Sequence, residues 1–433
     1  MRSLLRLCTA GSVDDGKSTL IGRLLHDSQG VYEDQVASVQ KASKGRTSGP
    51  IDFSLFTDGL KAEREQGITI DVAYRYFATA RRKFILADTP GHEQYTRNMA
   101  TGASTADAAI LLVDARHGMR VQSKRHARIA RLLGINHFVL AVNKMDLVEF
   151  DRGVFDRIHA DFAEILQGAH LHAIPISALL GDNVITKSEQ TPWFEGQSLL
   201  EYLETVEVDR SLAHQAFRMP VQLVLRPSHT FRGYAGQIEA GSVRVGDAIS
   251  AWPGGRKARV KQISSWDGDL EMAFAPMSVT LVLDDELDIS RGDLLAMGDV
   301  QVATRFEAEM VWMDERPLDP SRIYVMKHMT RTIAAEIDKP MELNQISSVV
   351  VTASRPVVFD PYAVNRFTGC FILVDPATNF TSGAGMMGMP VHEVREGSNR
   401  AGAAERLAQL ARMARTDDEA VSAIRQALEE MLK

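Results

Sequence analysis

The sequence predicts an α/β domain followed by two small β-barrel domains and a short helical tail. Up to about residue 210, short β-type runs alternate with helical stretches, which is typical of a mainly parallel sheet covered by helices. After Asp209, short strands separated by Gly, Pro and Asp turns replace this alternation and favour barrels. Ala403–Lys433 then has a helical period, with leucines and alanines on one face and charges opposite.

Length and composition limit the class of protein. The chain has 433 residues, enough for roughly three domains of about 150 residues each. Its net charge of −7 comes from 49 basic and 56 acidic residues, so no overall positive field draws it to nucleic acid. The two cysteines exclude a disulfide framework, and no apolar run approaches the ~18 residues of a membrane span. We therefore expect a cytoplasmic protein with no membrane or nucleic-acid partner.

The first domain, expected over residues 1–210, places its ligands at one sheet edge. In parallel α/β sheets ligands bind at the carboxyl ends of the strands, and each strand candidate runs into a polar or Gly-rich segment. The strand candidates are Leu4–Thr9, Phe84–Ala87, Ala109–Val113, Phe138–Val142 and Ala173–Ile176.

The two barrels are expected over residues 211–302 and 303–396, and the helical tail over 397–433. Alternating apolar runs bounded by turn residues mark their strands. Strand candidates in the first barrel are Val221–Leu225, Tyr234–Ile238, Ser242–Val245 and Val260–Ile263, and in the second Met310–Met313, Ile323–Met326, Ser348–Thr352 and Phe371–Val374.

A phosphate-binding loop follows the first strand candidate. The stretch from Gly11 to Ser18 fits G-x-x-x-x-G-K-[ST], and a helix is expected from about Thr19. Glycine lets backbone N–H groups close around phosphates at the positive helix N-terminus. Lys17 is expected to reach the β and γ phosphates and the Ser18 hydroxyl to coordinate Mg²⁺. The candidate binding residues here are Gly11, Ser12, Val13, Asp14, Asp15, Gly16, Lys17, Ser18 and Thr19.

A second motif, Asp88-Thr89-Pro90-Gly91-His92, follows the next strong strand candidate. The Asp88 carboxylate can hold the Mg²⁺ shell, and the Gly91 N–H can contact the γ-phosphate. A lone histidine is more often an ordinary polar residue than a catalytic one. Beside this motif, however, His92 stands where a side chain must orient the attacking water, so we expect it to be the catalytic residue.

A third motif, Asn143-Lys144-Met145-Asp146, reads the base. The Asp146 carboxylate can accept from N1–H and the 2-amino group of guanine, whereas adenine has neither donor. Unpaired buried polar groups make that mismatch costly, so the site selects GTP over ATP. Ser177 and Ala178, after another strand candidate, are expected to close the base pocket. Motifs in chain order, each at a strand end, predict a P-loop GTPase domain.

A switch segment is expected around Gly67-Ile68-Thr69. The Thr69 hydroxyl can complete the Mg²⁺ shell, and such a segment orders with GTP and relaxes on hydrolysis. By spacing alone, a charged helix end followed by a strand start accounts for it equally well. The candidate metal ligands are thus Ser18, Thr69 and Asp88.

Three stretches outside the motifs have plainer interpretations. Arg81-Arg82-Lys83 is expected at the tip of a charged hairpin, and Gly383-Ala384-Gly385 in a β-turn, since it lacks the lysine of a second phosphate loop. His170 and His172 place two imidazoles on one strand face, but without a third ligand nearby a zinc site is not favoured.

The motifs resemble the translational GTPase class, that is, elongation factor Tu and its relatives. Elongation factors typically have His at the position of Ser12, however, and here the sequence is similar to the sulfate adenylyltransferase subunit 1 family. The stretches that carry the two resemblances are Glu63–Thr69, Asp88–Glu93 and Asn98–Ala103 for the class, and Gly11–Leu25, Tyr32–Gln35, Asp71–Phe77, Glu93–Arg97, Gly181–Val184 and Arg232–Gly236 for the family.

The family resemblance implies a GTPase subunit of bacterial ATP sulfurylase. In that family a separate small catalytic subunit binds ATP and sulfate and joins them into adenosine 5′-phosphosulfate and diphosphate, and GTP hydrolysis on the large subunit drives this step. A translation-type GTPase that delivers RNA to the ribosome is the alternative. Some relatives continue into an adenylylsulfate kinase domain, and no second phosphate loop follows residue 146 here.

Overall fold

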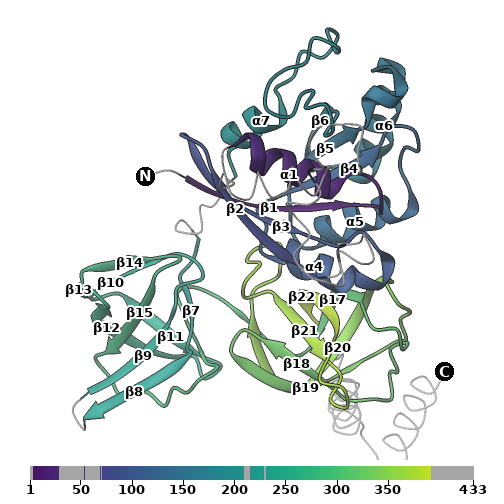
Figure 1. Ribbon diagram of the computed structural model, residues 1–433. Helices are drawn as coiled ribbons and strands as arrows, with labels where there is room; N and C mark the ends of the chain where they lie inside the picture. Colours follow the sequence, from purple (N-terminus) through teal and green to yellow (C-terminus); the bar gives the residue numbers. More distant parts are fainter. Residues whose placement is uncertain are drawn as a thin grey trace, which may run out of the picture. The chain divides into compact units, whose positions relative to one another are not determined.

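The structure is a computed structural model that describes residues 3–28, 53, 69, 71–208, 215–228 and 231–391 (Figure 1). The predicted helical tail and the switch residues Gly67 and Ile68 lie outside these ranges, whereas Thr69 lies within them. Residues Met1–Met389 form one compact unit. The four-domain division of the sequence remains a prediction.

A six-stranded sheet with the order β2-β3-β1-β4-β5-β6 forms the first part of this unit. All five predicted strands are present and parallel to one another, and the edge strand β2, the first strand of the expected hairpin at Arg81-Arg82-Lys83, pairs antiparallel with β3. The chain reverses its direction of winding between β1 and β4, which is where such sheets bind ligands. The elements are β1 (Ser3–Gly11), α1 (Lys17–Asp27), β2 (Ala73–Ala78), β3 (Arg82–Asp88), η2 (Glu93–Tyr95), α4 (Thr96–Ser104), β4 (Ala108–Asp114), α5 (Val121–Leu132), β5 (His137–Asn143), η3 (Met145–Val148), α6 (Arg152–Ile165), β6 (His170–Pro175) and α7 (Leu199–Thr205).

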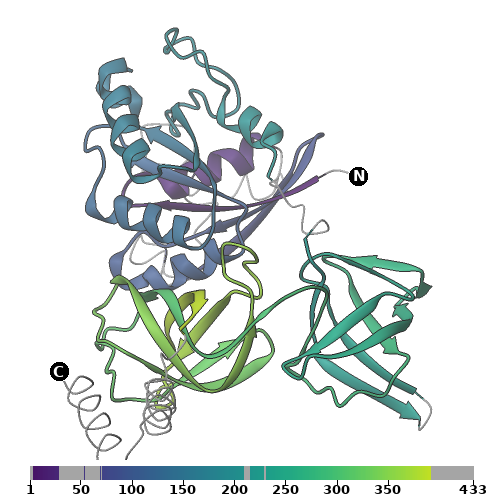
Figure 2. The same cartoon turned by 180° about the vertical axis from the view of Figure 1, so that it is seen from behind.

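Helices cover both faces of the sheet (Figures 1 and 2). Side chains alternate along β4, so Ile110 and Leu112 pack with α1 and α7, while Leu111 and Val113 pack with α4, α5 and α6. Burial on both faces explains why β4 reads as a continuous apolar run.

The first β-domain contains an eight-stranded sheet and the separate two-stranded sheet β10-β14, which share one core. The path of the larger sheet runs β7-β16-β11-β12-β15-β9-β8, and its two end strands are separated in the chain only by Val221 and Gln222. The predicted strand Val221–Leu225 therefore begins two residues late, at Leu223. The strands are β7 (Arg218–Pro220), β8 (Leu223–Ser228), β9 (Phe231–Gln237), β10 (Ser242–Arg244), β11 (Ala248–Trp252), β12 (Arg256–Ser265), β13 (Gly268–Leu270), β14 (Met272–Phe274), β15 (Ser278–Leu283) and β16 (Leu294–Ala296).

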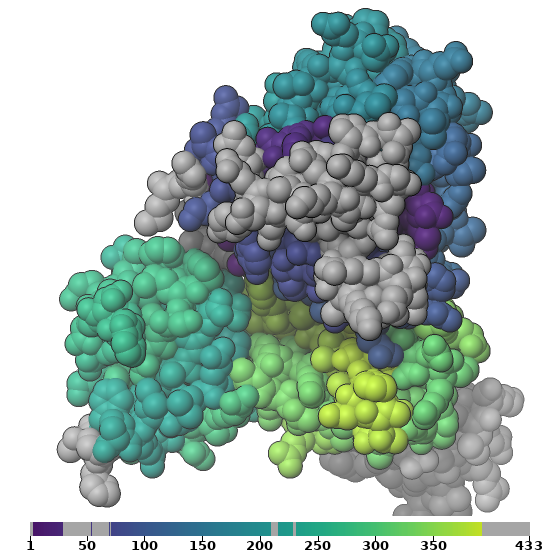
Figure 3. Space-filling view, in the orientation of Figure 1, coloured from purple at the N-terminus to yellow at the C-terminus, as the bar shows by residue number. Residues whose placement is uncertain are grey.

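The second β-domain is a closed barrel with the strand order β17-β20-β19-β18-β21-β22. Large apolar side chains such as Trp312, Phe306 and Phe359 fill its core. In Figure 3 its last strand, in yellow, lies at the surface, where Met389 is exposed. The strands are β17 (Gln301–Trp312), β18 (Tyr324–His328), β19 (Arg331–Ile337), β20 (Ile346–Phe359), β21 (Cys370–Val374) and β22 (Thr381–Pro390).

One sequence expectation is wrong, and another holds in part. Gly383-Ala384-Gly385 lies within β22 rather than in a turn, because its small residues let β22 pass close to the rings of Trp312 and Phe371. The hairpin expected at Arg81-Arg82-Lys83 is present: Arg81 lies in the turn between β2 and β3, and Arg82 begins β3. The Arg82 guanidinium donates to the backbone oxygens of Leu203 and Val206, at 3.0 and 2.7 Å.

Buried polar contacts join the three parts of the unit. The Arg218 guanidinium of β7 forms an ion pair with Asp360, at 2.9 Å, and also donates to the Met297 and Asp299 carbonyls. Arg97 of α4 donates to the Met313 carbonyl, at 3.1 Å. Val311, Met313 and Met386 complete the hydrophobic core beneath α4, α5 and α6.

Candidate functional site

A cavity of about 470 Å³ opens at the carboxyl ends of β1, β3 and β5. It brings together residues from the phosphate loop, the switch segment, the second motif and the base-reading motif. This convergence of four sequence segments could be foreseen from their positions at strand ends. The lining residues are Val13, Asp14, Gly16, Lys17, Ser18, Thr19, Thr69, Gly91, His92 and Lys144.

The phosphate loop needs glycine at position 16 for two reasons. Gly16 has φ +94°, a left-handed conformation that side chains rarely adopt. A Cβ atom there would also lie 2.4 Å from Nδ2 of Asn143. The glycine of the motif therefore allows the loop to sit against the base-reading motif.

Lys17 is buried at the start of α1 and folds back over the loop. Its Nζ donates to the carbonyl oxygens of Gly11 and Ser12, at 3.1 and 2.7 Å. Burial lowers the pKa of this amine, and the Asp15 and Asp88 carboxylates oppose the effect. A Cβ atom on Gly91 would lie 2.4 Å from this Nζ, so the second motif must approach the lysine as bare backbone.

The second motif is held against β1. The buried Asp88 carboxylate accepts from the Thr9 hydroxyl, at 3.4 Å, and the Thr89 hydroxyl donates to the Thr9 carbonyl. Pro90 and Gly91 are buried beyond them. Asp88 is thus fixed beside the loop that carries Ser18.

The oxygen donors here fit a hard cation. Ser18 and Thr69 line the cavity, and Asp88 stands at the end of β3. In the part of the chain that the structure describes, no three His, Cys, Asp or Glu residues cluster as a metal site. Mg²⁺ does not require such a cluster, because it is usually held by one or two carboxylates together with substrate phosphates and water.

His92 lines the same cavity just before η2. Its Nδ1 accepts from the Gln94 backbone N–H, at 3.4 Å, and its ring lies 5.9 Å from that of Tyr95. The next residue, Glu93, forms an ion pair with Arg125 of α5, at 2.5 Å. The imidazole therefore faces the cavity from a segment tied to α5.

Asn143 connects three of the motifs without lining the cavity. Its Nδ2 donates to the Asp15 carbonyl, at 2.8 Å, and its Oδ1 accepts from the Ala178 N–H, at 2.9 Å. Ser177 and Ala178 are buried and are not among the residues that line the cavity. Met145 is buried, whereas Asp146 is half-buried in the first turn of η3.

A charged cluster at the end of β4 escaped the sequence analysis. The buried Asp114 carboxylate pairs with Arg116, at 2.6 Å, and with Lys144, at 2.9 Å. Burial alone would raise the pKa of this carboxyl, but hydrogen bonds from Arg116 and Lys144 outweigh burial and hold it well below its usual range. Lys144 also donates to the Asp14 carbonyl, at 2.5 Å. The only signal in the sequence is the position of Asp114 after a strand candidate.

Helix α5 also contacts the phosphate loop, which no motif indicates. The Ser12 and Ser123 hydroxyls are hydrogen-bonded, at 3.1 Å, and both side chains are buried. Burial lowers the pKa of the fully buried His126 to about 3, although a hydrogen bond with the Gly11 backbone opposes the shift. A neutral histidine and a serine therefore support the loop from beneath.

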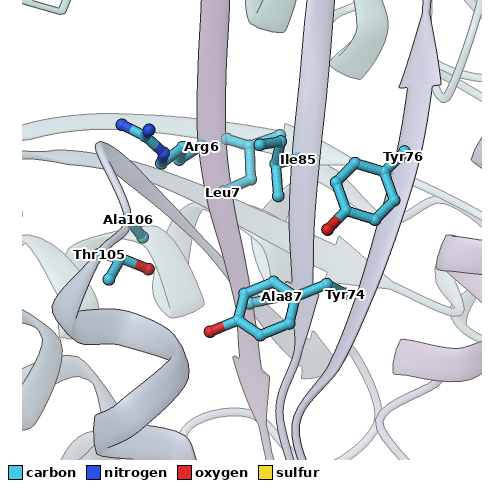
Figure 4. A pocket seen from close by; sticks show the side chains of 8 residues that line it. All are labelled: Arg6, Leu7, Tyr74, Tyr76, Ile85, Ala87, Thr105 and Ala106. Carbon is cyan, nitrogen blue, oxygen red and sulfur yellow. The ribbon is translucent and has the colours of Figure 1, made fainter.

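A second hollow lies on the sheet surface. Figure 4 shows the rings of Tyr74 and Tyr76, from β2, next to Ile85 and Ala87 of β3, with Arg6 and Leu7 of β1 on the other side of β3. None of the motif residues lines it. The paired histidines of β6 are elsewhere again: His170 stacks on His137 and His172 on Tyr202, with ring centroids 4.8 and 4.2 Å apart.

Comparisons with known proteins agree with this geometry. Residues 2–209 match the model of the elongation factor Tu GTP binding domain, and residues 338–388 match the GTP-eEF1A C-terminal domain-like family. A solved bacterial selenocysteine-specific elongation factor has a TM-score of 0.45 and 22% sequence identity, over 94% of this chain and 61% of its own. Residues 2–209 are thus a GTP binding domain of the elongation factor Tu type.

Relatives with higher sequence identity indicate a more specific family. Sulfate adenylyltransferase subunit 1 of Bacteroides thetaiotaomicron is 52% identical over 418 residues, which cover 89% of this chain and 86% of the relative. The proteins of the same name from Alteromonas mediterranea and Saccharophagus degradans are each 51% identical over 409 residues, with coverage of 89% and 87%. The chain belongs to the sulfate adenylyltransferase subunit 1 family, which confirms the resemblance found in the sequence. In the described ranges no helix is long and apolar enough to cross a membrane.

Proposed function

We propose that this chain hydrolyses GTP in the cavity beside β1 and thereby drives the reaction of ATP with sulfate on a separate catalytic subunit. That reaction yields adenosine 5′-phosphosulfate and diphosphate and is the first step of sulfate assimilation. One observation carries the proposal: four motif segments that suit GTP line one cavity in a chain about half identical to sulfate adenylyltransferase subunits.

In the proposed GTP complex, Lys17 leaves its loop carbonyls for the β and γ phosphates. This exchange suits a buried amine, because phosphate oxygens are stronger partners for an ammonium than neutral carbonyls are. Gly91 brings its N–H to the γ-phosphate, and Asp146 reads the guanine edge. Ser177 and Ala178 close the base pocket, and Ala178 donates its N–H to the Asn143 side chain.

Ser18, Thr69 and Asp88 are the residues proposed to hold Mg²⁺. The ion would neutralise developing charge on the β- and γ-phosphate oxygens when bound. His92 orients the attacking water, which its position at the cavity wall supports. Hydrolysis then releases the contacts of Thr69 and Gly91, the two residues that a γ-phosphate would hold.

The partner is proposed to be the small catalytic subunit that binds ATP and sulfate. We propose a cytoplasmic setting for this complex. RNA delivery, the alternative function, has less support, because the similar curated proteins are sulfate adenylyltransferase subunits and the chain is acidic overall. Their name, subunit 1, also implies a partner polypeptide.

The decisive experiment is to measure adenylyl-sulfate formation by this chain together with the small subunit encoded with it. We expect GTP to raise the yield and a non-hydrolysable GTP analogue to fail, because the driving force comes from hydrolysis. The matched variants are Lys17→Ala, which should abolish the GTP effect, and Lys187→Ala, on an exposed loop, which should not. A yield that does not depend on GTP, or salt-sensitive tRNA binding in its place, would overturn the proposal.

A further inference from the structure

A groove lies along α5, apart from both the nucleotide cavity and the hollow at Tyr74 and Tyr76. Its volume is about 600 Å³, which is within the range of small-molecule sites. It shares no lining residue with the cavity around the phosphate loop. The lining residues are Val121, Lys124, Arg125, Arg128, Arg131, Leu132, Ile165, Asn344 and Ile346.

All of the charged residues that line this groove are basic. Arg125 is paired with Glu93, and Arg131 donates to Asn136 and to the Gly168 carbonyl. The side chains of Lys124 and Arg128 have no hydrogen-bond or ion-pair partner among the residues that the structure describes. Two cations one helical turn apart, with no carboxylate in the lining, favour an anionic occupant.

Asn344 provides a second, independent indication of a ligand. It is only 7% exposed, yet neither Nδ2 nor Oδ1 finds a partner in the described ranges. A buried amide without partners costs about 1–3 kcal/mol, so such groups are rare unless something else satisfies them. Its side chain has one donor group and one acceptor, which suits a hydroxyl or a heterocyclic ring.

The remaining lining is apolar. Leu132 of α5, Ile165 of α6 and Ile346 of β20 line the groove and pack on the core that the helices share with the barrel. An inorganic anion would make no apolar contact with these side chains. A ring or an aliphatic group would cover them while its charge met the cations.

We propose that this groove binds an organic phosphate of nucleotide size, with its phosphates at Lys124 and Arg128 and its ring against Leu132, Ile165 and Asn344. The proposal is based on three features that lie in one groove: cations without partners, a buried amide without partners, and an apolar lining. The site goes beyond the proposed function and does not depend on it.

The test titrates ADP into the full-length chain that carries one bound equivalent of GDP with Mg²⁺ in its nucleotide cavity and from which free GDP has been removed. We expect one saturable event by calorimetry, and weaker binding of inorganic diphosphate, which has no ring. The double variant Lys124→Ala, Arg128→Ala should bind ADP at least ~10-fold more weakly, because two charge-assisted contacts are lost. The double variant Arg152→Ala, Arg157→Ala removes the same charge from the exposed face of α6 and should bind ADP normally.

Asn344→Asp gives a second measurement without a change of size. Asn344 has φ +63°, and aspartate tolerates that conformation, so the fold is expected to survive. The new carboxylate would repel phosphate and weaken ADP binding. No ADP binding to the GDP-loaded chain, release of the bound GDP by ADP, or equal affinity in the α5 double variant would each overturn the proposal.

Discussion

At the residue scale, the motif positions 16 and 91 require glycine because residues of other motifs pack closely against them. A side chain at position 16 would collide with Asn143, and one at position 91 would collide with Lys17. The motif spacing is thus a packing requirement between segments that are more than 70 residues apart in the chain. Single substitutions at the cavity should accordingly separate binding from chemistry only where a side chain faces the open space.

His92 is such a residue. We expect His92→Ala to leave GTP affinity nearly unchanged and to slow hydrolysis by ~10²-fold or more, since water positioning is lost while the phosphate contacts remain. Single-turnover phosphate release measures this effect. As a control, Tyr95→Phe removes only the hydroxyl of the ring beside the imidazole and should hydrolyse GTP normally. Equal turnover in His92→Ala would remove His92 from the catalytic role.

Asp146 is expected to determine the base. Asp146→Asn should weaken GTP binding and improve binding of xanthosine triphosphate, because the amide presents a donor where the carboxylate accepts. Competition between the two nucleotides measures this change. Asp151→Asn is the matched control, because that carboxylate instead caps α6 by accepting from the Val154 N–H, at 2.8 Å. An unchanged preference in Asp146→Asn would refute the assignment.

At the element scale, α5 and β18 carry buried histidines that the motifs do not include. His126 of α5 lies beneath the phosphate loop. His328 of β18 forms a hydrogen bond between Nε2 and the Thr368 carbonyl, at 2.8 Å. Burial lowers the pKa of His328 to about 4, so the folded chain keeps this imidazole neutral.

The His328 imidazole predicts a loss of stability in acid. Between pH 6.5 and about 4 the unfolded chain binds a proton at this residue and the folded chain does not. The contribution of neutral His328 to the free energy of unfolding is therefore complete above pH 6.5. It falls by about 1.4 kcal/mol per pH unit as the pH drops through that window. Urea unfolding at pH 7.5, 6.0 and 5.0 measures the free energy of unfolding. This free energy should fall less with decreasing pH in His328→Gln than in the unmodified chain. The exposed His117→Gln should behave like the unmodified chain, and equal losses in all three would contradict the assignment.

At the scale of the whole molecule, the Arg218–Asp360 ion pair joins the two β-domains. Both side chains are about 95% buried, and Thr368 also donates to the Asp360 carboxylate, at 2.6 Å. The other Arg218 donors are satisfied by carbonyl oxygens between β16 and β17. This arrangement fixes the chain segment where one β-domain leads into the next.

Asp360→Ala should lower the free energy of unfolding by about 3–5 kcal/mol, because it leaves the Arg218 charge buried without a partner. Denaturant unfolding of the full-length chain measures the change. Asp156→Ala breaks the exposed Arg152–Asp156 pair on α6 and should have little effect. Similar small losses in both variants would show that the buried pair does not hold the β-domains.

The sequence alone determined the fold class, the five parallel strands of the α/β sheet and the motif residues that line the nucleotide cavity. These features follow from local patterns, since a strand end, a glycine and a lysine can be read within a few residues of one another. Gly383–Gly385 was misjudged because the rings that lie against it, those of Trp312 and Phe371, belong to other strands.

Only the tertiary structure decided which side chains support the cavity and where a second groove lies. Asp114, Ser123 and Asn344 belong to no motif, and each acquires its role from a partner, or the lack of one, far along the chain. Burial sets the charge state of His328 and the cost of an unpaired Asn344, and burial is a property of the packed molecule. Local sequence could therefore predict the chemistry of the nucleotide site, while its supports and the groove on α5 depended on the fold.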